Sequence, residues 1–510
     1  MKNRQVVKVV SLAAGVLLTA SCGQQRSSTT GWAYNDPKNG GFEVPPYQEQ
    51  ETGPGLVLIE GGTFTMGRAE QDVMYDWNNI PRRVTVSSFY MDETEISNLA
   101  YLEYLHWTLR VFYANFPEVY KKALPDTLVW REKMAYNEPY VDYYLRHPAY
   151  ADYPVVGVNW LQANDYCSWR TDRVNEYILV REGILEHNPT PTEADYFNTD
   201  QYLAGKWTGQ VKTPLPSIDP NGSGERQVKM EDGIFLPKYR LPTEAEWEFA
   251  AVGLIGNTVD ERVTERRLYP WNRRGVRNDD DKFLGQMLAN FKRGAGDNMG
   301  VAGALNDNAD ITAPVLSYWP NDYGLYNMAG NVSEWVMDTY RPLSAEDKDD
   351  FRPFRGNVFK TAIKDVDGIV INTDSIAYDK DSNIISIPGQ VKMRDVGIAY
   401  KEDRLDERRN YNKSDNINYL DGDVQSSIFY TEGEEAVASK GNRLMYESTG
   451  ATPTSLINDK AKVYKGGSWR DRAYYMVPGS RRFLDQRQAT AYIGFRCAMT
   501  RVGSPKGLNR

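Results

Sequence analysis

The amino-acid sequence predicts an α+β fold, because it combines short apolar segments bounded by glycine turns with a few helical segments that begin at clear N-terminal caps. The 510 residues, 41% of them hydrophobic, provide enough apolar side chains for a substantial core and exclude global disorder. Lys and Arg number 60 against 69 Asp and Glu, so the chain lacks the basic excess that binds phosphates. We therefore expect no nucleic acid among its partners.

Ordered structure is predicted to begin near residue 56. The segments 56–59 and 63–66 flank a Glu-Gly-Gly turn, a pattern typical of a β-hairpin. The segment 84–89 alternates apolar and polar residues, which predicts another half-buried strand.

Three helices are predicted from their N-terminal caps. Ser97 precedes a segment whose leucines share one helical face: Leu99, Leu102, Leu105 and Leu109. Asn159 precedes a second segment with apolar residues near helical spacing. Thr243 and Glu246 form a capping box for a third helix, in which Trp247 is expected to face inward.

Two long segments interrupt this pattern, at about 171–239 and 341–461. Both are polar, carry runs of charge and have weak hydrophobic periodicity. Structureless loops of this length are uncommon in compact domains, so we expect these insertions to contain some secondary structure and to serve in binding.

The N-terminus predicts export and lipidation. A cationic start precedes an apolar run at 9–20, which is shorter than the roughly 18 residues of a membrane-spanning helix. The run ends in Leu-Thr-Ala-Ser before Cys22, which resembles a lipobox; an ordinary secretory signal with an incidental cysteine is the alternative. We predict a signal peptide at 1–21, a lipidated tether at 22–54, a body at 55–502 and a tail at 503–510. Residues 31–42 are too aromatic for a pure spacer and are expected to dock on the body or on a partner.

Common catalytic patterns are absent from the sequence. With 3 Cys and 3 His, the chain cannot form a four-cysteine zinc module or a disulfide-rich scaffold. It also lacks a nucleotide-binding P-loop, a His-Glu-x-x-His pair and a Gly-x-Ser-x-Gly elbow. Glu244 and Glu246, at the start of a capped helix, are better explained as partners of the helix dipole than as an acid and base pair.

Seven segments carry a specific resemblance to a known family. They are, in order, GGTFTMG at 61–67, DETEISN at 92–98, PVVGVNW with a later Tyr-Cys at 154–167, RLPTEAEWEFA at 240–250, YGLYNMAGNVSEW at 323–335, KGGSW at 465–469 and IGFRC at 493–497. Together they resemble the formylglycine-generating-enzyme, or sulfatase-modifying-factor, family. The resemblance implies a variant C-type lectin-like fold, here with two long insertions.

The same resemblance implies that the family's chemistry is absent. Its oxidases activate oxygen at a copper ion held by two cysteine thiolates shortly after the Gly-Gly-Ser segment. The matching positions are Asp471 and Met476, and soft Cu(I) prefers thiolates. We therefore expect a pseudoenzyme without a catalytic cofactor; an exported copper-dependent oxidase with a divergent site is one alternative, and a lectin-like glycan or peptidoglycan binder is another.

The resemblance further implies structural calcium, an ion that prefers oxygen ligands. The first implied site comprises Asn327, Gly330, Val332 and Glu334. The second comprises Asn290, Phe291, Asp307 and Ala309. The alternative for the first site is that Asn327 and Asn331 are turn residues and Glu334 is a solvated charge.

A disulfide is also implied by the family, at the positions of Cys167 and Cys497. This agrees with the cysteine count, since lipidation of Cys22 leaves two thiols in an exported protein.

The lipobox, the Gly-Trp-Ala-Tyr-Asn-Asp-Pro segment and the long insertions resemble the gliding-motility and type IX secretion lipoproteins of Bacteroidetes, of the GldJ, GldK and PorK type. That resemblance implies an outer-membrane lipoprotein that faces the periplasm. It also implies a non-catalytic role in a large assembly with a GldN- or PorN-type periplasmic ring protein and with other lipoproteins of the machinery. Both a GldJ-like and a GldK-like or PorK-like assignment remain open.

Overall fold

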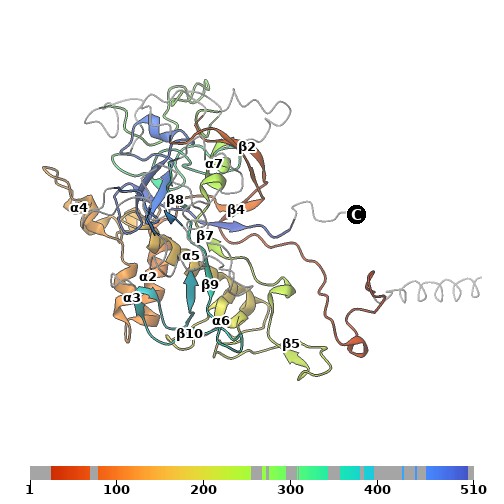
Figure 1. Ribbon diagram of the computed structural model, residues 1–510. Helices are drawn as coiled ribbons and strands as arrows, with labels where there is room; N and C mark the ends of the chain where they lie inside the picture. The colour runs from red at the N-terminus through yellow and green to blue at the C-terminus, as the bar shows by residue number, and fades with distance from the viewer. Residues whose placement is uncertain are drawn as a thin grey trace, which may run out of the picture. The chain divides into compact units, whose positions relative to one another are not determined.

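The computed structural model describes residues 25–68, 78–253, 267–271, 275–294, 307, 309–342, 357–378, 384–395, 428–429, 443–444 and 455–503 (Figure 1). The predicted signal peptide and Cys22 lie outside the described residues. Within those residues, no helix combines the length and the apolar character needed to span a membrane.

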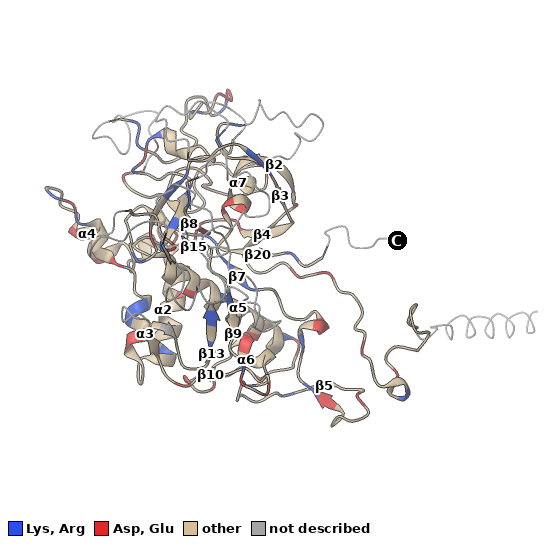
Figure 2. Cartoon of the chain, viewed as in Figure 1, with Lys and Arg blue, Asp and Glu red and all other residues tan. Residues whose placement is uncertain are grey.

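The chain divides into two compact units. The smaller unit is built from Met1–Glu49, Ile178–His187 and Gln210–Phe235, and the larger from Gln50–Tyr177, Asn188–Gly209 and Leu236–Arg510. The smaller unit thus takes residues from both the predicted tether and the first predicted insertion. Along the described elements, acidic and basic residues are interspersed (Figure 2).

The smaller unit has little regular structure. Its elements are η1 (Pro37–Asn39), β5 (Leu215–Pro216), β6 (Glu225–Arg226) and η4 (Met230–Asp232), with β5 and β6 antiparallel. Glu43 fixes the N-terminal segment to this hairpin, since its carboxylate pairs with the Arg226 guanidinium at 2.6 Å and accepts from the Ile218 N–H at 3.0 Å. Gly41 has a left-handed φ of 70°, and a Cβ there would collide with the Ile218 carbonyl. This part of the tether therefore packs against the first insertion.

The larger unit contains two four-stranded sheets. The first is antiparallel, with the order β1 (Leu56–Ile59), β4 (Phe89–Asp92), β20 (Ala498–Thr500) and β7 (Tyr239–Arg240). The second has the order β18 (Arg482–Asp485), β17 (Ala461–Lys465), β8 (Ser333–Thr339) and β19 (Ile493–Gly494), with β19 parallel to β8. In the first sheet the strand β20 lies between β4 and β7, two strands from much earlier in the chain, so this sheet is complete only with residues 498–500 in place.

The predicted hairpin of 56–59 with 63–66 is wrong. β1 pairs with β4, whereas β2 (Gly62–Met66) pairs with β3 (Arg82–Val86). The link between β1 and β2 lies against the chain at 86–88: the Gly61 N–H donates to Ser88 Oγ at 3.0 Å, and a Cβ on Gly61 would collide with the Val86 carbonyl. Gly61 is therefore required for a close approach of backbones and not for a hairpin turn.

The helices of the larger unit begin largely where the caps predict. They are α2 (Asn98–Phe112), α3 (Pro117–Ala123), α4 (Glu138–Tyr143), α5 (Trp160–Arg181), α6 (Thr199–Leu203) and α7 (Glu244–Val252), with the short helices η2 (Thr127–Trp130), η3 (Pro148–Tyr150) and η8 (Ala473–Met476). Of α5, the residues up to Tyr177 belong to this unit. Ser97 accepts from the Ala100 N–H at 3.3 Å, and Asn159 accepts from the Gln162 N–H at 2.9 Å. Thr243 and Glu246 form the predicted capping box. Helix α5 extends past residue 171, the predicted start of the first insertion.

The predicted leucine face of α2 is only partly buried. Leu105 is buried, but Leu99 is 59% exposed and Leu109 38% exposed. Tyr101 and Tyr104 are buried instead, and the Tyr101 ring stacks on that of Tyr166 in α5 at 5.7 Å between centroids. Aromatic rings bury more apolar surface than leucine, which explains why the aromatic face of the helix turns inward.

The second insertion has secondary structure of its own, as predicted. Its described strands are β9 (Lys360–Ala362), β10 (Asn372–Thr373), β11 (Ala377–Tyr378), β12 (Ile384–Ser386), β13 (Gln390–Val391), β14 (Met393–Asp395), β15 (Ile428–Phe429) and β16 (Arg443–Leu444), which form two-stranded pairs. Ile376 and Ile387 pack against a buried cluster that includes Phe112, and the Tyr196 hydroxyl donates to the Pro388 carbonyl at 2.9 Å. The described part of this insertion is therefore fixed to the larger unit.

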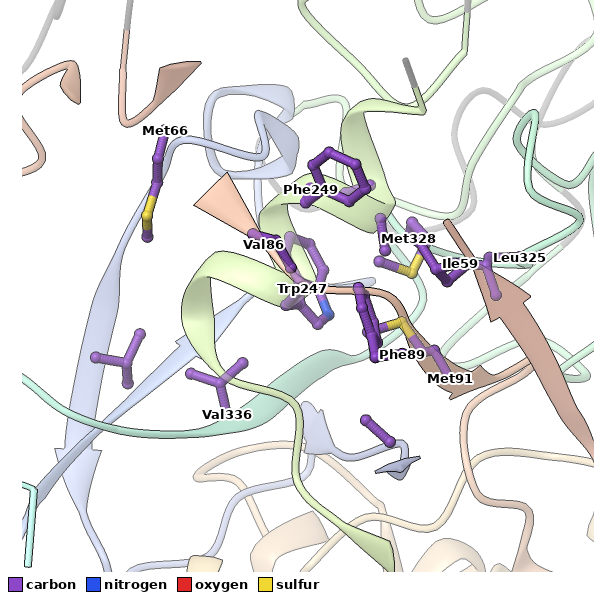
Figure 3. Close-up of a cluster of buried hydrophobic side chains, with 14 of the residues drawn as sticks. Ile59, Met66, Val86, Phe89, Met91, Trp247, Phe249, Leu325, Met328 and Val336 are labelled. Atoms are coloured by element: carbon purple, nitrogen blue, oxygen red, sulfur yellow. The ribbon is translucent and has the colours of Figure 1, made fainter. Parts of the chain in front are cut away.

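The main hydrophobic core forms around α7 (Figure 3). Trp247 and Phe249 extend from this helix toward Phe89 and Met91 of β4 and toward Met328. Trp247 and Phe89 have no exposed surface. This core fixes the strands from which the loops of the candidate site emerge.

Candidate functional site

The segment after β17 contains the positions at which the family resemblance places copper ligands. Gly466 and Gly467 have left-handed φ angles of 98° and 69°. A Cβ on Gly466 would lie 3.1 Å from the Trp247 ring, and one on Gly467 would lie 3.0 Å from the Tyr475 backbone. Glycine is therefore needed at both positions for the chain to turn from β17 into residues 468–476.

At the first ligand position, Asp471 forms a two-point ion pair. Its Oδ1 and Oδ2 each lie 2.7 Å from an amino nitrogen of Arg482, and Ser468 Oγ donates to Oδ2 at 2.6 Å. The Asp471 carbonyl also accepts from the Lys292 N–H at 2.9 Å. Both carboxylate oxygens are thus occupied by charged or hydroxyl donors within the protein.

Arg482 is itself fixed by two aromatic rings. Its guanidinium carbon lies 4.8 Å from the centroid of Tyr464 and 4.3 Å from that of Tyr475, and it donates to Ser333 Oγ at 3.0 Å. Burial by itself lowers the pKa of Arg482, but the hydrogen bond and the charge of Asp471 outweigh it and raise that pKa. Arg482 is therefore held in its charged form.

At the second ligand position, Met476 is fully buried. Its side chain belongs to a hydrophobic cluster with Tyr269, Met287, Ala289, Phe291, Ala329 and Val477. A neutral thioether inside an apolar cluster and a carboxylate in an ion pair are not a dithiolate site for Cu(I). Across the part of the chain that the structure describes, no group of three or more His, Cys, Asp or Glu side chains could hold a metal ion.

The first predicted calcium site does not fit a cation. The fully buried Glu334 carboxylate is engaged by Arg496, with Oε1 at 2.6 Å from one nitrogen and Oε2 at 2.7 Å from another. The Trp247 indole N–H also donates to Oε2, at 2.7 Å. The guanidinium supplies the positive charge that calcium would supply, so the prediction that Glu334 is a calcium ligand, and the alternative that it is a solvated charge, are both wrong in this structure.

The asparagines of the same segment bind a second buried carboxylate. Asn327 Nδ2 donates to Glu95 Oε2 at 2.9 Å, and Asn331 Nδ2 donates to Glu95 Oε1 at 3.0 Å. Both asparagines have left-handed φ angles, 54° and 60°, which confirms the alternative that they are turn residues. Burial raises the pKa of Glu95 to about 8, against the opposing effect of the Arg496 charge. Sequence reasoning missed this role of Glu95, although it lies within one of the seven motif segments.

The second predicted calcium site fits a cation. Asn290 Oδ1 and Asp307 Oδ2 are buried and have no hydrogen-bond partner, while Asn290 Nδ2 donates to the Ile311 carbonyl at 2.7 Å. Burial raises the pKa of Asp307 to about 6, and the backbone N–H groups of Ala309 and Phe291 partly oppose this. A buried carboxylate oxygen without a partner is costly, and a calcium ion would satisfy it.

The two remaining cysteines lie side by side, as predicted, but they are free thiols in this structure. Cys167 Sγ and Cys497 Sγ are 3.5 Å apart and both residues are buried. A disulfide requires about 2.05 Å between the sulfurs, so the predicted bond is not formed here. Burial raises the pKa of the Cys497 thiol, which favours the protonated form.

Comparison with known proteins identifies the family of this chain. The family described as "Sulfatase-modifying factor enzyme 1-like domain" matches residues 41–381, which is more than half of the chain. The chain belongs to this family. The mixture of helices and sheets agrees with the predicted α+β class. The family match confirms the resemblance of this chain to the sulfatase-modifying-factor family.

Curated relatives of this sulfatase-modifying-factor-like chain include active and inactive proteins. The chain is 27% identical over 285 residues to the formylglycine-generating enzyme of Mus musculus, covering 56% of this chain and 58% of that enzyme. It is 27% identical over 299 residues to the enzyme of Thermomonospora curvata, covering 58% of this chain and 75% of that one. It is 25% identical over 326 residues to the inactive C-alpha-formylglycine-generating enzyme 2 of Mus musculus, covering 59% of this chain and 73% of that protein.

The chain spans 58% of the mouse enzyme and 66% of the one from Bos taurus. Among solved structures, PvdO from Pseudomonas aeruginosa is similar at a TM-score of 0.39 and 15% identity, covering 87% of this chain and 93% of that one.

Proposed function

We propose that this protein is a non-catalytic, lipid-anchored structural member of its family, with the variant C-type lectin-like fold that the motifs imply. The observation that carries the proposal is the geometry at the two positions that match the copper ligands. Copper binding there would require breaking the Asp471–Arg482 ion pair and opening the apolar cluster around Met476. A relative named as inactive also supports a non-catalytic role for a chain of this family.

Copper titration tests the absence of the oxidase chemistry. We expect the full-length chain to bind no stoichiometric Cu(I) and to consume no oxygen in the presence of a thiol reductant, because neither position offers a thiolate. Cu(I) binding is measured by competition with a chromogenic chelator, and oxygen consumption with an electrode. The mouse formylglycine-generating enzyme, assayed in parallel, is the positive control, and stoichiometric binding with turnover by this chain would refute the proposal.

The finer proposal is a role in the Bacteroidetes type IX secretion and gliding machinery. The signal segment ending at Cys22, the tether and the two polar insertions support an outer-membrane lipoprotein of the GldJ, GldK or PorK type that faces the periplasm. Its proposed partners are a GldN- or PorN-type ring protein and other lipoproteins, in a large assembly. Structural calcium held by Asn290 and Asp307, with the Phe291 and Ala309 carbonyls, is part of this proposal.

Removal of the second insertion tests its proposed role in assembly. The deletion of 358–455 retains Asn357, which donates to Asp338 Oδ1 at 3.1 Å, and also retains the Arg341–Asp459 ion pair. We expect this variant to remain folded by circular dichroism but to lose its partner in affinity purification from native outer membrane followed by mass spectrometry. Normal recovery of the partner with the folded variant would show that the insertion does not mediate assembly.

A further inference from the structure

The larger unit contains a cavity of about 490 Å³ that does not include the copper-ligand positions and that adjoins the proposed calcium site, with which it shares Asp307 and Ala309. It lies between two segments, 140–153 and 307–318. The side chains that decide its chemistry are Tyr140, Tyr150, Tyr153, Tyr318, Asp307 and Asp310. A pocket with aromatic walls and a few polar groups is the usual form of a small-ligand site.

The aromatic walls of the pocket are held in place. Tyr150 and Tyr153 meet at an interplanar angle of 74° with centroids 5.1 Å apart, so their rings form a corner. The Tyr140 hydroxyl donates to Asp310 Oδ2 at 2.7 Å, and the Tyr318 hydroxyl donates to the Asp307 carbonyl at 2.9 Å. These bonds fix two further rings at the pocket by their hydroxyl ends.

Tyr318 has an unusual backbone conformation. Its φ of 65° is in the left-handed region, which is rare for a bulky residue and costs about 1–3 kcal/mol. Residues held in such conformations are concentrated at functional sites. Here the conformation places the Tyr318 ring on the pocket wall with its hydroxyl bound to the opposite end of the 307–318 loop.

The charge that the pocket offers to a ligand is that of the Asp310 carboxylate. Its lining contains no Lys, Arg or His, and its second carboxylate, that of Asp307, is the one proposed to hold calcium. Asp307 is buried, whereas Asp310 is exposed and accessible to a ligand. A carboxylate accepts several hydrogen bonds, so the bond from Tyr140 leaves Asp310 with capacity for a further donor.

We propose that this pocket binds an organic cation, namely a primary ammonium or a guanidinium group. The tyrosine rings attract a cation through their negative faces, and the Asp310 carboxylate supplies a charge-assisted hydrogen bond. A neutral sugar would also stack on tyrosine rings, but it would leave the Asp310 carboxylate without a counter-charge. The cation can come from a free small molecule or from the basic side chain of a polypeptide, and the inference does not depend on the assembly role proposed above.

Calorimetric titration of the full-length chain in calcium-containing buffer tests the proposal. Nα-acetylarginine amide is expected to bind one to one, whereas its neutral isostere, Nα-acetylcitrulline amide, is expected not to bind. A Gly-Arg-Gly-Gly peptide that binds more tightly than the arginine amide would identify a polypeptide as the source, and equal affinities would identify a small cation. Equal binding of the arginine and citrulline probes would overturn the proposal.

Matched variants locate the site. Asp310→Asn is expected to weaken binding of the arginine probe by about tenfold or more, because a hydrogen bond to a charged group is lost. Tyr150→Leu is expected to weaken it severalfold through loss of the ring face. Asp367→Asn, at an exposed turn, should leave the affinity unchanged. Unchanged affinity in Asp310→Asn would place the cation elsewhere.

Calcium distinguishes this pocket from the neighbouring metal site. If Asp307 holds calcium, Asp307→Asn should lose any calcium-induced rise in melting temperature, whereas Asp310→Asn should keep it. If the calcium-free protein binds the arginine probe but loses that binding when calcium is added, Asp310 serves the metal ion and the proposal is overturned.

Discussion

Replacement of Arg496 by methionine is expected to destabilise the protein by about 3–5 kcal/mol, because it leaves the buried Glu334 carboxylate without its counter-charge. Arg496 and Glu334 have no exposed surface, and two nitrogens of the guanidinium lie 2.6 and 2.7 Å from the carboxylate oxygens. Arg496 also donates to the Tyr326 carbonyl at 2.8 Å and to the Asp92 carbonyl at 3.2 Å. The substitution therefore removes the counter-charge of Glu334. It also removes the donor to two main-chain carbonyls, those of Tyr326 and Asp92.

Urea unfolding followed by far-UV circular dichroism measures the effect on the free energy of unfolding. The double variant Arg496→Met/Glu334→Leu should recover part of the loss, because removal of both charges leaves no uncompensated ion in the core. Arg146→Met, at an exposed position, controls for the loss of an arginine and should change stability by less than about 0.5 kcal/mol. A loss below about 1 kcal/mol in Arg496→Met would show that the buried pair is not formed.

Local features of the fold were predictable from the sequence because they depend on neighbouring residues. Ser97, Asn159 and Thr243 cap their helices through bonds to residues three positions later. Strand pairing was not predictable in the same way. The sequence around Gly61 fits a hairpin, and only the approach of the chain at Val86 shows why β1 pairs elsewhere.

In the candidate site, too, contacts between residues far apart in the sequence could not be predicted. The motifs located Glu334 and the segment that contains Arg496, but nothing in the sequence indicated that residues 162 positions apart pair with each other in place of a metal. The tyrosine pocket was missed altogether, since Tyr140 and Asp310 are 170 positions apart and belong to no common motif. The motifs were sufficient to identify Asp471 and Met476 as the matching positions. The groups that contact them, Arg482 and the apolar cluster around Met476, are evident only from the structure.

Truncation of Trp247 is the second change with a large expected effect. Trp247→Ala is expected to cost about 3–5 kcal/mol, because the side chain is fully buried at the centre of the main core and the surrounding strands cannot collapse into its place. Trp247→Phe keeps much of the ring but removes the indole N–H that donates to Glu334 at 2.7 Å. We expect it to cost about 1.5–3 kcal/mol, the range for a hydrogen bond to a charged group. Chemical denaturation measures both changes, with Trp32→Ala, at a side chain that is 66% exposed, as the control.

The two large effects are coupled through one carboxylate. Trp247 and Arg496 both donate to Glu334 Oε2, at 2.7 Å each. Once Arg496 is replaced, the Glu334 side chain loses the two hydrogen bonds that fix its position, and its remaining bond to the indole N–H contributes less. The double variant Trp247→Phe/Arg496→Met should therefore lose less stability than the sum of the single variants, by about 0.5–3 kcal/mol. Strict additivity would show that the indole and the guanidinium stabilise the core independently.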